Sequence, residues 1–291
     1  MKLKKLFAGI DFLIFGDENV NIKNLAHNSK DVKQKCLFFC LKGRTHSGFD
    51  YVNDAIKNGA EAIVVDKGTY KSYKTLIDGL NESIVVVENV RSIVSHVCHN
   101  FYNGSKFNFK LIGITGTNGK TTISNIIANG LINAGYSVCV IGTSGVFING
   151  DALKGEELTT PDPIDLYNIF EFINKIYVDY CIMEVSAHAL DLNKVDSLCF
   201  EYGIFTNLTE DHLDYFVNME NYYQAKKKFF KLVKNAIINI DDEYGKLYYK
   251  EFSKNKISYG KTSLENKIIY NNKYFKDCVK WKKSETILST T

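Results

Sequence analysis

Residues 115–122 read Thr-Gly-Thr-Asn-Gly-Lys-Thr-Thr, and these are residue types that bind phosphate. Gly116 and Gly119 allow a tight turn that points backbone N–H groups at an anion. Lys120 can reach the β- and γ-phosphates of a nucleotide, and the Thr121 hydroxyl can ligate Mg²⁺. The segment therefore predicts a nucleotide site, with an ordinary strand-to-helix turn as the alternative.

Two further candidate residues follow predicted strands. Glu184 comes directly after the apolar residues 180–183. A carboxylate at such a strand end commonly ligates Mg²⁺ beside a phosphate loop, and a solvated strand terminus is the alternative. For His212, after residues 203–205, a metal ligand, a phosphate contact and a surface residue all stay open. Ligands of open α/β sheets bind beyond the carboxyl ends of the strands, so we expect one shared site.

Lys226 lies on the apolar face of a helix predicted over residues 219–233. At about 100° per residue it falls among aromatic side chains such as Tyr222 and Phe229. A buried ammonium group is costly unless it is paired or chemically changed. The alternative is a lysine whose stem passes the aromatic rings to reach solvent, and the helical geometry alone leaves both readings open.

The elements that must position these residues alternate between strands and helices, which is typical of an α/β layer architecture. The apolar runs predict strands at 36–41, 62–65, 84–87, 110–114, 137–141, 180–183, 203–205 and 237–240. The amphipathic stretches predict helices at 49–59, 90–102, 123–132, 166–173, 219–233 and 242–252. Short alternating stretches after residue 255, such as 267–270 and 278–281, predict an antiparallel edge.

Length and composition indicate a soluble protein of two domains, residues 1–106 and 107–291. The net charge of +3 does not argue for nucleic acid. Seven cysteines without a Cys-x-x-Cys pair indicate free thiols in a reducing cytoplasm. No apolar run is long enough to cross a membrane, so we expect a cytoplasmic monomer without membrane contact.

The motif series resembles that of the Mur ligases. The matching segments are 116–122, 159–162, 183–188, 205–214 and 219–226, and the resemblance runs from residue 25 to residue 250 in the family's order. Within the family, the series is most similar to the ligases that add the third residue of the peptide. The resemblance implies an N-terminal α/β domain of the UDP-binding type and a central ATP-binding domain with a mostly parallel sheet.

The activity implied by the resemblance is ATP-dependent amide formation in peptidoglycan precursor synthesis. In this family a carboxylate of UDP-N-acetylmuramoyl-L-alanyl-D-glutamate attacks the γ-phosphate of ATP, and the resulting acyl phosphate accepts the amine of an amino acid. The sequence does not determine whether that amino acid is lysine, diaminopimelate or another.

Residue roles carry over by motif. The resemblance implies that ATP is held by Gly116, Thr117, Asn118, Gly119, Lys120, Thr121 and Thr122. It places Mg²⁺ on Thr121 and Glu184, and a second ion on His212 and a carbamylated Lys226. The implied catalytic residues are Lys120, Glu184, His212 and Lys226. The implied contacts to the UDP-muramoyl peptide are Ser29, Thr159, Thr160, Ser186 and Lys194.

Some positions depart from the family pattern. Asn28 and Lys30 stand where Asp and Arg are usual, and Leu192 and Lys194 stand where Gln and Arg contact the substrate. The family's third domain, which binds the amino acid, is not found before Thr291. We therefore expect residues 1–291 to bind ATP, with ligation absent or very slow.

Two alternative functions remain. One is a ligase of the folylpolyglutamate type, against which Thr121, Thr122 and residues 159–161 argue. The other is a non-catalytic fragment that binds a nucleotide or a UDP-sugar.

Overall fold

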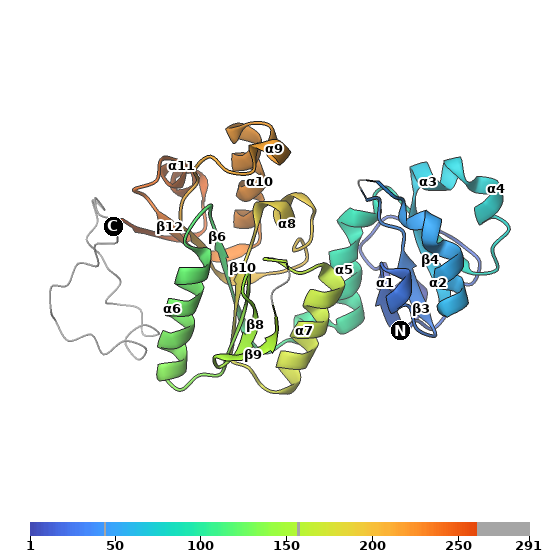
Figure 1. Cartoon of the computed structure of the whole chain (residues 1–291), viewed down its shortest axis with the longest axis horizontal. Helices are drawn as coiled ribbons and strands as arrows, with labels where there is room; N and C mark the ends of the chain where they lie inside the picture. Colours follow the sequence, from blue (N-terminus) through green and yellow to red (C-terminus); the bar gives the residue numbers. More distant parts are fainter. Residues whose placement is uncertain (44, 156–157, 261–291) are drawn as a thin grey trace. The chain divides into compact units, whose positions relative to one another are not determined.

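The computed structural model describes residues 1–43, 45–155 and 158–260, which form two compact units (Figure 1). The first unit comprises Met1–Asn108, Thr160–Ile176 and Ser186–Cys199. The second comprises the described residues of Phe109–Thr159, of Tyr177–Val185 and of the segment from Phe200 to residue 260. The first boundary between the units, at Asn108 and Phe109, lies two residues after the predicted domain boundary, and two later segments belong to the first unit.

The first unit contains a five-stranded sheet in the order β1-β5-β4-β3-β2. Its strands are β1 (Leu13–Phe15), β2 (Asn24–Ala26), β3 (Cys36–Phe39), β4 (Ala60–Asp66) and β5 (Ser83–Val87). All neighbouring pairs are parallel except β1 and β5. Strands β3 and β5 are buried along their whole length, as their continuous apolar sequences predict for a parallel sheet covered on both faces.

The first unit also contains helices, some of which contact this sheet. They are α1 (Leu3–Leu6), α2 (Val52–Asn58), α3 (Lys67–Ser72), α4 (Lys74–Ile77), α5 (Val90–Tyr102), α7 (Pro163–Lys175) and α8 (Ala187–Asp191). Helix α2 ends where Gly59 takes a φ of 110°, which only glycine adopts without strain. Helix α5 begins at Asn89, whose side chain accepts a hydrogen bond from Arg91 N. Among the described residues, no helix is long and apolar enough to cross a bilayer.

The second unit contains an eight-stranded sheet in the order β13-β12-β11-β6-β10-β7-β8-β9. Its strands are β6 (Lys110–Thr115), β7 (Val138–Gly142), β8 (Gly145–Ile148), β9 (Asp151–Lys154), β10 (Tyr180–Glu184), β11 (Phe200–Phe205), β12 (Val233–Asn239) and β13 (Asn255–Tyr259). The sheet is parallel from β13 to β7, which confirms the predicted α/β class. Strand β6, which leads into the phosphate loop, lies between β11 and β10.

Helices cover both faces of the second sheet. They are α6 (Lys120–Asn133), α9 (Leu213–Phe216), α10 (Met219–Lys231) and α11 (Glu243–Glu251). Ile112 and Ile114 of β6 share a core cluster with Ala128 of α6. Gly113, between them, faces the opposite side, where a Cβ would lie 2.7 Å from the Phe229 ring of α10. Because side chains of a strand alternate in direction, α6 and α10 pack on opposite faces of β6.

The predicted antiparallel edge after residue 255 is wrong for β13, which pairs parallel with β12. Helix α11 returns the chain between the two strands, and a strand reached through a helix crossover pairs parallel with its predecessor. The antiparallel edge is formed instead by β7, β8 and β9. The stretches 267–270 and 278–281 lie outside the described residues.

Val217, between α9 and α10, has φ 71° and ψ −42°, a conformation that is strained for a β-branched residue. We expect Val217→Gly to stabilise the protein by about 1 kcal/mol, because relief of this strain exceeds the entropic cost of glycine. Little packing is lost, since Val217 is 76% exposed. Chemical denaturation measures the change.

Ile126→Gly is the matched control for this substitution. Ile126 is also β-branched and exposed, but it lies inside α6 with right-handed geometry, so the same change should destabilise by about 1 kcal/mol. Equal destabilisation of both variants would contradict the assignment of strain to Val217.

Candidate active site

The phosphate-loop segment turns between β6 and α6. Gly116 and Gly119 have φ values of 150° and 85°, and Gly119 is the N-cap of α6 without a side-chain cap. The first-turn N–H groups of α6 and the Lys120 side chain together form a concentration of donors suited to an anion. Lys120 Nζ donates to Gly116 O at 2.9 Å and to Thr117 O at 2.8 Å. Burial lowers the pKa of Lys120, while the Glu184 and Asp211 carboxylates oppose this shift.

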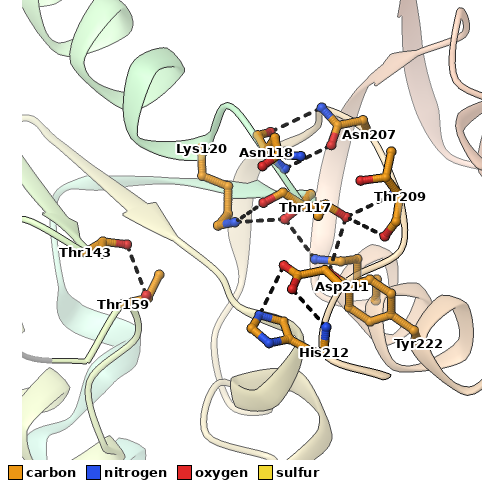
Figure 2. A network of polar contacts seen from close by, with 12 residues as sticks. Thr117, Asn118, Lys120, Thr143, Thr159, Asn207, Thr209, Asp211, His212 and Tyr222 are labelled. Carbon is orange, nitrogen blue, oxygen red and sulfur yellow. Dashed lines mark hydrogen bonds and ion pairs between the residues drawn. The ribbon is translucent and has the colours of Figure 1, made fainter. Parts of the chain in front are cut away.

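The segment after β11 holds the loop in place (Figure 2). Thr117 N donates to Asn207 O at 2.9 Å, and Asn118 N donates to Asn207 Oδ1 at 2.9 Å. Thr209 N donates to Thr117 Oγ1 at 3.0 Å. The Gly116 backbone packs closely against Thr206, because a Cβ at residue 116 would lie 1.8 Å from Thr206 Oγ1. Asn207 and Thr209 were not predicted as site residues, because their contacts with the loop depend on β11 pairing beside β6.

Glu184 ends β10 with only 1% of its surface exposed. Its Oε1 accepts a hydrogen bond from Thr121 Oγ1 at 2.8 Å, and its Oε2 accepts one from Thr143 Oγ1 at 3.2 Å. The predicted pair Thr121 and Glu184 is therefore in direct contact. Thr143, directly after β7, was not predicted as a site residue.

Lys226 is buried, with 1% of its surface exposed, which agrees with its predicted place on the apolar face of α10. Its Nζ donates to Gly116 O at 3.0 Å and lies 4.9 Å from the centroid of the Tyr222 ring. The pKa of Lys226 lies well below its usual value, first because of burial and then because of the positive charge of Lys120. The Asp211 carboxylate acts in the opposite direction. A lysine with a lowered pKa loses its proton at a lower pH, and the neutral amine that results is the reactive form.

His212 lies near the same helix but is 48% exposed. Its Nε2 is 3.4 Å from Asp211 Oδ2, and its ring centroid is 6.4 Å from that of Tyr222. Tyr222 also contacts the loop, since its hydroxyl lies 3.3 Å from Thr117 Oγ1 (Figure 2). Tyr222 therefore joins three predicted parts of the site, although sequence periodicity marks it only as a core residue.

The predicted substrate residues fall in both units. In the first unit, Ser186 N donates to Thr160 Oγ1 at 3.0 Å, and Lys194 Nζ lies 2.9 Å from Asp162 Oδ1. Ser29 lines an open pocket of about 580 Å³ in that unit. In the second unit, Thr159 Oγ1 lies 3.0 Å from Thr143 Oγ1.

Models of known protein families match most of the chain. The Mur ligase middle domain matches residues 114–289, and the catalytic domain of the Mur ligase family matches residues 21–102. The UDP-N-acetylmuramoyl-L-alanyl-D-glutamate--2,6-diaminopimelate ligase 1 of Clostridium acetobutylicum is 44% identical over 263 residues, 90% of this chain and 53% of the relative. The corresponding ligase of Clostridioides difficile is 41% identical over 251 residues, 86% of this chain and 50% of the relative. The chain thus spans about half the length of these curated relatives.

Solved structures support the fold. A UDP-N-acetylmuramoyl-L-alanyl-D-glutamate--2,6-diaminopimelate ligase superposes with a TM-score of 0.74 at 23% identity, covering 91% of this chain and 53% of that chain. The MurF ligase from Thermotoga maritima in complex with ADP superposes with a TM-score of 0.52 at 20% identity, covering 82% of this chain and 51% of that chain. At these identities the likeness concerns the fold alone.

Proposed function

The chain belongs to the Mur ligase family, and we propose that it forms the nucleotide- and muramoyl-peptide-binding part of an ATP-dependent ligase. The proposed reaction joins an amino acid to UDP-N-acetylmuramoyl-L-alanyl-D-glutamate in the cytoplasm. The curated relatives are named for this reaction with 2,6-diaminopimelate, and we propose the same amino acid here. Residues 1–106 would bind the UDP-sugar, and the residues from 107 onward would bind ATP.

One observation carries this proposal: a buried carboxylate and a buried lysine both contact the phosphate-loop segment. Glu184 accepts a hydrogen bond from Thr121, and Lys226 donates one to Gly116. Both side chains are 1% exposed. Buried ionisable groups are costly to maintain, so their convergence on a phosphate loop favours a catalytic site over a structural turn.

The residues around Glu184 fit a magnesium ion. The Thr121 hydroxyl and the Glu184 carboxylate are hard oxygen donors, which Mg²⁺ prefers, and the ion commonly completes its shell with phosphate oxygens and water. Among the described residues, no group of three or more His, Cys, Asp or Glu side chains could hold a metal ion. Thr121 and Glu184 would therefore hold the ion together with the nucleotide.

Lys226 as an unmodified amine does not fit a second ion, because its Nζ is a donor to Gly116 O. Carbamylation would turn this group into an oxygen ligand, and the lowered pKa of Lys226 favours the neutral amine that reacts with CO₂. We propose that His212 and carbamylated Lys226 hold the second ion.

The chain's own groups would bind and orient both reactants. Lys120 and the first-turn N–H groups of α6 would align the γ-phosphate, and Thr159, Thr160, Ser186, Lys194 and Ser29 would hold the muramoyl peptide. Bound Mg²⁺ would neutralise negative charge as the substrate carboxylate approaches the phosphate.

Titration calorimetry with ATP tests the nucleotide assignment. We expect binding in the presence of Mg²⁺ and a loss of affinity of about tenfold or more when EDTA removes the metal, since Thr121 and Glu184 would hold the ion and the ion would neutralise phosphate charge. Addition of UDP-N-acetylmuramoyl-L-alanyl-D-glutamate and diaminopimelate to the same sample tests for ligation, which is measured as ADP release and as the mass of the product. Absence of ATP binding in Mg²⁺ would overturn the proposal.

A further inference from the structure

The Glu184 carboxylate accepts hydrogen bonds from two threonine hydroxyls, one to each of its oxygens. Thr121, from the first turn of α6, donates to one carboxylate oxygen, and Thr143, from the turn between β7 and β8, donates to the other. The first threonine belongs to the phosphate loop and is a proposed metal ligand. The second has no part in the function proposed above.

The backbone before Thr143 is shaped to receive the same carboxylate. A Cβ placed on Gly142 would lie 2.1 Å from Glu184 Oε1 and 2.6 Å from its Cδ. Any side chain at residue 142 would therefore displace the carboxylate. The end of β7 thus contributes both the space and a hydrogen-bond donor that set the orientation of Glu184.

Thr143 also reaches the segment that carries a proposed substrate contact. Figure 2 shows the Thr143 and Thr159 side chains facing each other, with their hydroxyl oxygens 3.0 Å apart. A hydroxyl has one hydrogen to donate, and an ionised carboxylate only accepts. Since Thr143 donates to Glu184, Thr159 must donate to Thr143, and the three groups form a directional chain.

We propose that Thr143 is a positioning residue that orients Glu184 toward the magnesium ion of the bound nucleotide and links this carboxylate to Thr159. The proposal rests on the function proposed above. Groups that hydrogen-bond a metal ligand fix its orientation, and their loss typically costs about 10–100-fold in metal affinity or activity.

Manganese titration in the presence of ADP, followed by electron paramagnetic resonance, measures metal affinity without turnover. We expect Thr143→Val to weaken Mn²⁺ binding about 10-fold or more. Thr143→Ser, which restores the hydroxyl, should bind Mn²⁺ with near wild-type affinity. Ser144→Ala, which removes a hydroxyl from the next residue of the same turn, is the matched control and should also leave the affinity unchanged.

A double-mutant cycle tests the link to Thr159. Thr159→Val should weaken Mn²⁺ binding less than Thr143→Val does. The double variant should bind Mn²⁺ no more weakly than Thr143→Val, because the hydrogen bonds from Thr159 through Thr143 to Glu184 are already interrupted at Thr143. Thermal unfolding of each variant separates this effect from a general loss of structure. Wild-type affinity in Thr143→Val would overturn the inference alone, whereas a wild-type chain that binds neither ADP nor Mn²⁺ would overturn the proposed function.

Discussion

Lys120→Ala should bind ATP more weakly by about 1.5–3 kcal/mol, which is roughly a 10- to 150-fold rise in Kd. The ammonium group of Lys120 lies on the loop, where its Nζ donates to Gly116 O and Thr117 O. We expect it to exchange these carbonyl partners for phosphate oxygens, and the resulting charged hydrogen bonds are stronger than neutral ones. Titration calorimetry with MgATP measures the change.

Lys71→Ala, on α3 of the first unit, is the control for the lost positive charge. Its side chain is exposed, and the substitution should leave ATP affinity unchanged. Lys120→Met separates the charge from the stem, because methionine keeps most of the aliphatic length. If Lys120→Ala and Lys120→Met both bound ATP as tightly as the wild type, the phosphate assignment of Lys120 would be refuted.

Lys226→Met should stabilise the protein by about 1–4 kcal/mol in CO₂-depleted buffer, the range seen when buried ion pairs are replaced by well-packed apolar residues. The wild type must bury an amine beside Lys120, whose positive charge further lowers the pKa of Lys226. Methionine has a similar length and fits among the aromatic side chains of α10. Gly116 O keeps a donor after the substitution, because Lys120 Nζ also bonds to it.

The pH dependence of stability has a definite sign. The folded-state pKa of Lys226 is lowered, so between this value and the ordinary lysine pKa the unfolded chain binds more protons than the folded one. The free energy of unfolding therefore rises with pH across this window, and Lys226→Met should remove that contribution. Lys231→Met, at the exposed end of α10, should not change this pH dependence of the free energy of unfolding.

The same variants test carbamylation. With ¹³C-labelled bicarbonate, the wild type and Lys231→Met should show a carbamate carbonyl signal by NMR, and Lys226→Met should lack it. If Lys226→Met were less stable than the wild type and kept the carbamate signal, two assignments would be refuted: that the buried Lys226 amine destabilises the fold, and that Lys226 is the carbamylated residue.

Local patterns were sufficient to predict most elements of the parallel sheets. Strand β10 and helix α5 lie where apolar runs and amphipathic periodicity predicted them. The short strands β1, β2, β8 and β9 were missed, because each has at most four residues and little apolar periodicity. The parallel pairing of β13 was missed because pairing direction depends on the connection through α11 rather than on the strand's own residues.

The sequence by itself determined the chemistry of the candidate site. The glycines and Lys120 of the loop, the carboxylate of Glu184 at a strand end and the place of Lys226 on the apolar face of α10 all follow from residue type and local periodicity. The burial of Lys226 was left open by the sequence and comes from the structure. Only the tertiary structure decided which groups meet. Asn207 contacts the loop because β11 pairs with β6, and Thr143 contacts Glu184 because β7 pairs with β10. Strand order is set by the packing of the whole sheet, so no local pattern encodes these contacts.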